Sequence, residues 1–237
     1  MEILLYSIFL RNFKLVIILK NQSQPKGKGM DFTTQYKDII YNKMSALSKW
    51  NKRKVAMFGL ERQYKSYCQF ADKKIWNRKE EYRILLDKCW DAILNEQLLD
   101  ESAWEYHETL KPENEAIQKT VSYEEKYNEY NLTYANIFAG NVEEMLNCLI
   151  DDDDNEEAFL LLYIDCFIID YLCDIYEKQQ NLRYTAEERE KLYQSDLIKM
   201  EIKSQFDDID NIFCIIDYPS VFARIGQSPA ALGDWIL

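Results

Sequence analysis

The sequence predicts an all-α protein, with a single helical domain of about eight helices arranged around one central apolar helix. Three observations predict this fold class. The 237 residues contain only six glycines and four prolines, whereas strand-rich folds need more turn residues. Apolar side chains recur at steps of three and four residues along most of the chain, as on one face of a helix. Several polar residues also stand three positions before an acid, which is typical of helix N-termini.

Three helices are expected in succession in the first part of the chain. They cover Phe32–Leu47, Lys49–Ala71 and Arg78–Gln97. In the second and third helices, apolar and tyrosine side chains repeat at helical spacing. Only a short link around residues 73–77 separates these two helices, so we expect them to form an antiparallel hairpin.

Further helices are predicted by their N-terminal signals. A side-chain acceptor followed three residues later by an acid can satisfy the free amides of a first helical turn. Ala139–Gly140 comes directly before one of these signals and predicts a break between two helices. The three signals are Ser122 with Glu125, Asn141 with Glu144, and Thr185 with Glu188.

The segment Ala158–Tyr176 is the most apolar in the chain and is expected to be the central helix, because its apolar side chains cover most of the circumference. Its aspartates and its length argue against a membrane span. A helix over Ala186–Met200 is expected next. In the tail, Phe213–Ile216 predicts a short strand or a helical turn, and Pro219 and Pro229 are expected to break any regular element after it.

Residues 1–29 are expected to be a leader outside the domain, which then covers residues 30–237. The leader is apolar, but charge interrupts it at Arg11 and Lys14. The tetrapeptide Lys26–Gly29 precedes Met30, and its codons are purine-rich, like a ribosome-binding site. We therefore hypothesise that the natural start is Met30.

Charge is distributed unevenly along the chain. Between Asp91 and Asp170 there are twenty-one acidic residues and three basic ones, whereas Met30–Trp90 has fourteen basic and seven acidic residues. This split predicts a dipolar surface whose acidic side attracts a cationic partner. The net charge of −12 argues against binding to nucleic acid or to anionic membranes.

No pattern in the sequence predicts catalysis, a cofactor or a metal. His107 is the only histidine, and no Cys-x-x-Cys pair occurs, so a zinc site is not expected. Asp151–Asp154 resembles the start of a calcium loop but lacks its glycine and its final acid, which favours a solvated loop. Asp165 lies in an apolar run, and either pairing with an arginine such as Arg62 or Arg83, or a position facing solvent, is favoured over an acid–base role. The protein is therefore expected not to be an enzyme.

Tyrosines among acids are the candidate binding residues. Aromatic side chains supply contact energy at interfaces, and carboxylates steer a basic partner toward them. The alternative is that these tyrosines belong to the edges of an ordinary core. The candidates are Trp104, Glu105, Tyr106, Glu108, Tyr123, Glu124, Glu125, Tyr127, Glu129 and Tyr130.

The stretch Leu47–Leu94 resembles a family of small all-helical bacterial immunity proteins encoded beside polymorphic toxins, the family numbered six in common naming. The resemblance rests on Trp50, Val55–Phe58, Glu61–Arg62 and Leu86–Asp91. A weaker similarity, to the YjaG-type all-helical family of unknown function, rests on three segments, Glu61–Tyr64, Tyr67–Phe70 and Tyr82–Asp87.

The first resemblance implies a cytoplasmic protein that binds and neutralises a cognate toxin, and the charge pattern predicts that this toxin has a basic surface. The alternative is a non-enzymatic regulatory or signalling-associated helical protein, which the second resemblance implies. Neither nucleic acid nor a membrane is an expected partner.

Overall fold

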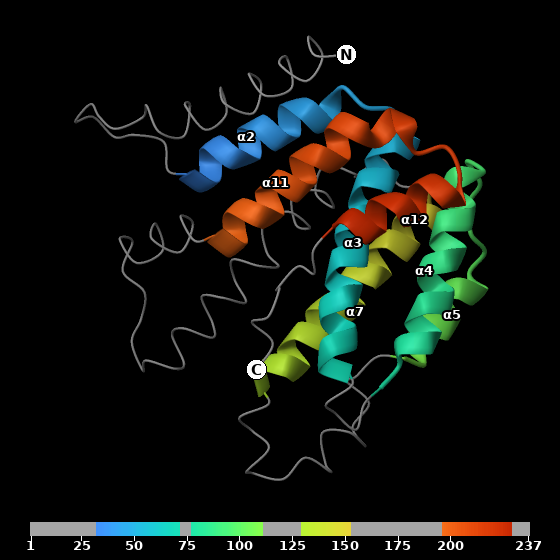
Figure 1. The fold of residues 1–237 in the computed structure, drawn as a ribbon. Helices are drawn as coiled ribbons and strands as arrows, with labels where there is room; N and C mark the ends of the chain where they lie inside the picture. The colour runs from blue at the N-terminus through green and yellow to red at the C-terminus, as the bar shows by residue number, and fades with distance from the viewer. Residues whose placement is uncertain (1–31, 72–76, 111–128, 153–195, 229–237) are drawn as a thin grey trace, which may run out of the picture.

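The computed structural model describes residues 32–71, 77–110, 129–152 and 196–228, and these residues form an all-helical protein with no strand among them (Figure 1). The predicted fold class is confirmed, with seven α-helices in the described part of the chain. The helices are α2 (Phe32–Ser45), α3 (Lys49–Ala71), α4 (Lys79–Leu94), α5 (Ser102–Glu108), α7 (Glu129–Ile150), α11 (Asp196–Asn211) and α12 (Tyr218–Gln227), and a 3-10 turn, η2 (Ile212–Cys214), joins the last two.

Helix α3 is central to the described structure and contacts α4, α7, α11, η2 and α12 (Figure 1). Every residue from Val55 to Gln63 is buried, so this helix is covered on all sides over more than two turns. The central position was predicted for Ala158–Tyr176, which lies outside the described residues, as do residues 1–29.

The core between α3, α4 and α7 is built mainly from aromatic rings. Tyr67 stacks on Phe138 with ring centroids 5.0 Å apart, and Tyr82 meets Phe138 edge-on at the same separation. Trp90 packs on Phe58, also at 5.0 Å. Such offset and edge-to-face contacts stabilise a core beyond the burial of area alone.

The predicted hairpin of α3 and α4 is confirmed, and two tyrosines of α3 fix where α4 begins. The Tyr67 hydroxyl accepts a hydrogen bond from the Arg78 backbone N–H at 3.0 Å, and the Tyr64 hydroxyl donates to the Lys79 carbonyl at 2.9 Å. The two helices lie side by side and run in opposite directions (Figure 1).

The predicted break at Ala139–Gly140 is wrong, because α7 runs without interruption from Glu129 to Ile150. Gly140 lies within this helix, and a side chain added there would meet no other atom within 4 Å, so close packing does not require a glycine at this position. Asn141 does not cap a helix. Its side-chain amide donates instead to Gln63 of α3 at 3.0 Å, which explains why the helix-start signal failed.

The C-terminal helices also differ from the expectation. Helix α11 continues past the predicted end at Met200 to Asn211. Of the two alternatives expected around Phe213, a short strand or a helical turn, the structure has the turn, η2. Pro219 begins a helix instead of interrupting one, because it occupies the first turn of α12, where its missing N–H costs nothing. The side chains of Asp217 and Ser220 cap this turn reciprocally, with Ser220 N 3.0 Å from the Asp217 carboxylate.

None of the helices in the described ranges is long and apolar enough to cross a membrane. The predicted helix starts at Ser122 and Thr185 fall outside those ranges.

Candidate protein-binding surface

The two arginines of α3 point into the protein rather than into solvent. Arg62 is only 1% exposed, and its guanidinium binds two carboxylates, with Nε 2.9 Å from Glu201 and a terminal nitrogen 2.5 Å from Asp208. Arg224 of α12 donates to the other oxygen of Asp208 at 2.7 Å. This cluster of two arginines and two acids, which we call the ionic core, joins α3, α11 and α12.

A second buried carboxylate belongs to Glu61, the residue that precedes Arg62 on α3. Glu61 is 2% exposed and accepts two hydrogen bonds from Arg83, each of 2.8 Å, and one from Trp90 Nε1 at 2.8 Å. Three charge-assisted contacts compensate the desolvation of this carboxylate. Arg62 and Arg83, the predicted partners of Asp165, thus bind other acids, and Asp165 itself lies outside the described residues.

Lysines of α3 cap the C-terminal segments. Lys54 donates to the Ile215 carbonyl at 2.9 Å, and Lys65 donates to the carbonyls of Ile225 and Ser228 at 2.5 Å each. Burial lowers the pKa of both ammonium groups. Cations near the end of a helix stabilise its free carbonyls.

Arg53 caps the C-terminal end of α7, because it donates a hydrogen bond to the Cys148 carbonyl at 2.6 Å. Its guanidinium also lies 4.5 Å from the ring centroid of Trp50. Four basic residues of α3 therefore bind acids or carbonyls within the protein: Arg53, Lys54, Arg62 and Lys65. The expected basic pole of the surface is correspondingly reduced, since Arg53 and Arg62 hardly reach solvent.

The side of the molecule formed by α5 and the end of α7 has the opposite character. Between Asn95 and Leu110 the only basic residue is His107, which is buried, and α7 contains neither lysine nor arginine. We call the acids on this side the acidic face: Glu96, Asp100, Glu101, Glu105, Glu108, Glu143 and Glu144. Two large apolar side chains are exposed beside them, Leu98 (48%) and Trp104 (38%).

Two hydrogen bonds position α5 on α7, and a third opens α5 itself. The Leu99 backbone N–H donates to the Leu149 carbonyl at 2.9 Å, and a His107 ring nitrogen, Nε2, lies 3.0 Å from the Ala139 carbonyl. The Ser102 backbone N–H donates to the Asp100 carboxylate at 2.9 Å and opens the helix. The hydrogen bonds from Ser102 lower the pKa of Asp100, which keeps this acid charged.

The predicted binding residues are only partly within the described structure. Trp104, Glu105 and Glu108 are exposed on α5, and Tyr106 is half-buried against the core. The backbone of Glu129 and Tyr130 forms the first turn of α7. Outside the described residues lie Tyr123, Glu124, Glu125 and Tyr127.

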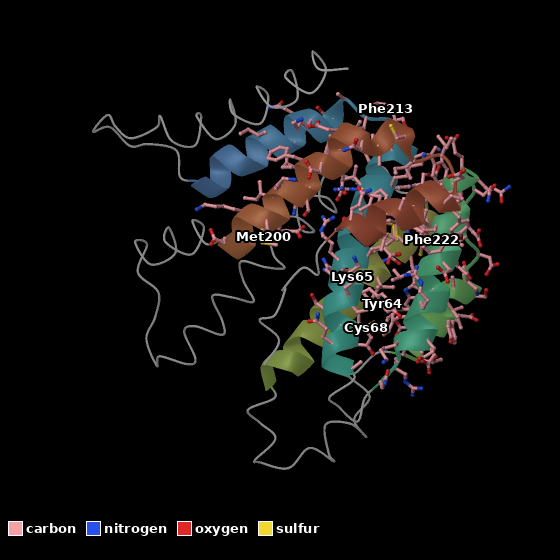
Figure 2. The ribbon with its side chains drawn as sticks, in the orientation of Figure 1. Tyr64, Lys65, Cys68, Met200, Phe213 and Phe222 are labelled. Carbon is pink, nitrogen blue, oxygen red and sulfur yellow. The ribbon has the colours of Figure 1, made fainter. Side chains whose placement is uncertain are left out.

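An exposed apolar corner at η2 and α12 was not predicted. Phe213, Ile216 and Phe222 are 71%, 75% and 56% exposed, and Figure 2 shows the two phenylalanines on the side where η2 and α12 lie. Tyr218 stacks on Phe222 and donates to Asp91 of α4 at 2.8 Å. Residues 212–216 are all apolar, so the sequence does not distinguish the buried Ile212 and Ile215 from the exposed side chains beside them.

A cluster of metal-binding side chains was also missed. One potential ligand atom from each of His107, Glu108 and Glu143 lies within 4.8 Å of the other two. The sequence separates His107 from Glu143 by 36 positions, so only the packing of α5 on α7 brings them together.

No protein-family model matches the sequence, and no curated protein or solved structure is significantly similar to it.

Proposed function

We propose that this protein is a non-enzymatic inhibitor, a cytoplasmic immunity protein that binds and neutralises a basic bacterial toxin domain. The observation that carries the proposal is the acidic face, where seven carboxylates and the exposed Trp104 belong to residues 95–110 and to α7, two described parts of the chain that contain no lysine or arginine.

Charge and aromatic contact have separate roles in such a complex. Long-range attraction between the acidic face and a basic partner raises the association rate, most strongly at low ionic strength. Trp104, exposed on α5, supplies apolar contact area within the same face, as aromatic anchors do in protein interfaces. A surface of this kind suits a partner whose own active face is basic, such as a domain that acts on nucleic acid.

The inward orientation of the arginines supports the same proposal. Because Arg53 and Arg62 bind groups inside the protein, they do not neutralise the acidic face from the neighbouring surface. The resemblance of Leu47–Leu94 to immunity proteins is independent support, since it rests on residues of α3 and α4 rather than on the acidic face.

Co-expression with a candidate toxin tests the proposal. The candidate is the C-terminal domain of a secreted protein encoded by the adjacent upstream gene, and its toxicity is measured as loss of growth. We expect the wild-type protein to restore growth and the Glu105→Lys variant to restore it less. Asp196→Lys is the matched control, because it reverses an exposed acid in the first turn of α11, far from α5 in Figure 1.

Failure of the wild-type protein to restore growth, or to bind the purified domain, would contradict the proposal. Equal loss of protection in both variants would show that net charge matters and that the acidic face does not.

A further inference from the structure

We propose that His107, Glu108 and Glu143 form a binding site for one divalent transition-metal ion, with Zn²⁺ as the preferred ion. One nitrogen and two carboxylate oxygens from these residues lie within 4.8 Å of one another. Ligand atoms that each lie about 2.0–2.2 Å from zinc are about 3.4 Å apart in a tetrahedral site. Side-chain rotation that brings the three atoms closer together would therefore close the site around the ion.

The hydrogen bond of His107 determines which ring nitrogen binds the ion. The Ala139 carbonyl can only accept, so Nε2, 3.0 Å away, carries the proton and donates it. In the neutral ring the lone pair is then on Nδ1, which is the nitrogen that can coordinate a metal. Metal-binding histidines commonly donate their other N–H to a backbone carbonyl, and this bond orients the ring.

The fold holds the histidine rigidly. His107 has no exposed surface, and its ring contacts Tyr82 edge-on with centroids 6.1 Å apart. Glu143 is half-buried on α7, one turn after Ala139, so the residue that orients the ring and the residue that would share the ion belong to one helix face. Glu108 is exposed and would close the site from solvent.

The mixture of ligands selects the class of ion. Imidazole suits zinc and other late transition metals, whereas magnesium and calcium prefer a shell of oxygens alone. Three protein ligands leave a fourth tetrahedral position for water or for a group from a partner. Two carboxylates also compensate the charge of a divalent ion. The site joins the C-terminal end of α5 to α7, so bound zinc stabilises the attachment of the acidic face.

Titration of the metal-free full-length protein with ZnCl₂, monitored by calorimetry, tests the proposal. We expect one zinc ion per chain and an increase in the melting temperature that MgCl₂ does not reproduce. Glu143→Gln is expected to weaken zinc binding at least about tenfold. Glu144→Gln is the matched control, since it changes the next residue of α7 and is expected to leave affinity within about twofold.

Substitution of His107 can unfold the protein because the residue is buried, so Glu108→Gln serves as the second test variant and is also expected to weaken binding. Cobalt adds a structural readout, because a tetrahedral site with one nitrogen ligand gives visible absorption that the glutamate variants should lose. The proposal is overturned if zinc does not bind, or if Glu143→Gln and Glu144→Gln have equal affinity.

Discussion

The two sides of α3 are stabilised in different ways. On the side of α4 and α7, aromatic rings such as Tyr67, Tyr82 and Phe138 pack together. On the side of α11 and α12, buried charges make the contact, chiefly those of Arg62 and Asp208. This difference between the two sides of α3 explains how the charges in the sequence are distributed over the protein. Arg62, Lys54 and Lys65 of α3 attach the C-terminal segments, whereas α5 and α7 contain no lysine or arginine and carry most of the acidic face.

Arg62→Met is expected to have the largest effect on stability among single substitutions. It preserves most of the side-chain volume but leaves Asp208, which is fully buried, with Arg224 alone. Breaking a buried ion pair typically costs about 3–5 kcal/mol. Chemical denaturation should therefore show a loss of this size in the free energy of unfolding.

Lys203→Met is the control for Arg62→Met, because Lys203 forms an exposed pair with Asp207 on α11. Such a pair is worth about 0.5 kcal/mol or less. Similar losses for the two variants would mean that the ionic core does not hold the C-terminal helices.

Alkaline pH tests the aromatic side of α3. Burial raises the pKa of Tyr67 and of Tyr82, so the folded protein keeps both phenols neutral while the unfolded chain ionises them near pH 10. Their contribution is complete below pH 10 and is lost as the pH rises. At pH 11 each tyrosine should lower the free energy of unfolding by about 1.4 kcal/mol. Tyrosinate absorbance that appears before unfolding would contradict this.

Trp90→Phe should destabilise the protein by about 1–3 kcal/mol, because it removes the indole N–H that binds the buried carboxylate of Glu61. Trp104→Phe is the matched control on the acidic face, where the effect should stay within about 0.5 kcal/mol. Thermal unfolding of the two variants compares the interior with the proposed binding surface, and a reversed order would contradict the assignment of their roles.

The smallest effect is expected at the end of α7. Hydrogen bonds from Lys49, and then from Arg53, lower the pKa of Asp152. A lowered pKa means that the carboxylate stabilises the fold above the pKa of the unfolded chain, near pH 4, and that this stability is lost as the pH falls through the folded value. Asp152→Asn should slightly reduce the dependence of the free energy of unfolding on pH below about pH 4. Asp151→Asn is the control, and an equal effect would count against the pairing.

Local signals were sufficient to predict the fold class and the α3–α4 hairpin. The periodicity of α3 identifies it as a helix, because side chains three and four residues apart share a face, but it does not show that Glu61, Arg62 and Gln63 are buried as well. The errors arose where tertiary contacts override local preference. Asn141 resembles a helix cap by itself but binds Gln63 instead. Pro219 is a different case, because the local capping pair Asp217 and Ser220 shows that it starts a helix, and this local signal was not read.

The candidate sites were harder to predict than the fold. The acidic face could be anticipated from residue counts, since no lysine or arginine occurs between Asn95 and Leu110. The inward direction of Arg62 could not, because its partner Asp208 lies 146 residues away. For the same reason His107 was set aside as a lone histidine, and only the packing of α5 on α7 reveals Glu143 beside it.

The central claim is that the acidic face binds a basic protein because it is negative and accessible. The most direct test is the association rate constant with the candidate toxin domain, measured at several salt concentrations for the wild-type protein, for Glu105→Lys and for Asp196→Lys. The wild-type protein and Asp196→Lys should associate rapidly at low salt and slow steeply as salt increases, while Glu105→Lys should be slower with a shallower dependence. Three identical salt dependences would contradict the claim.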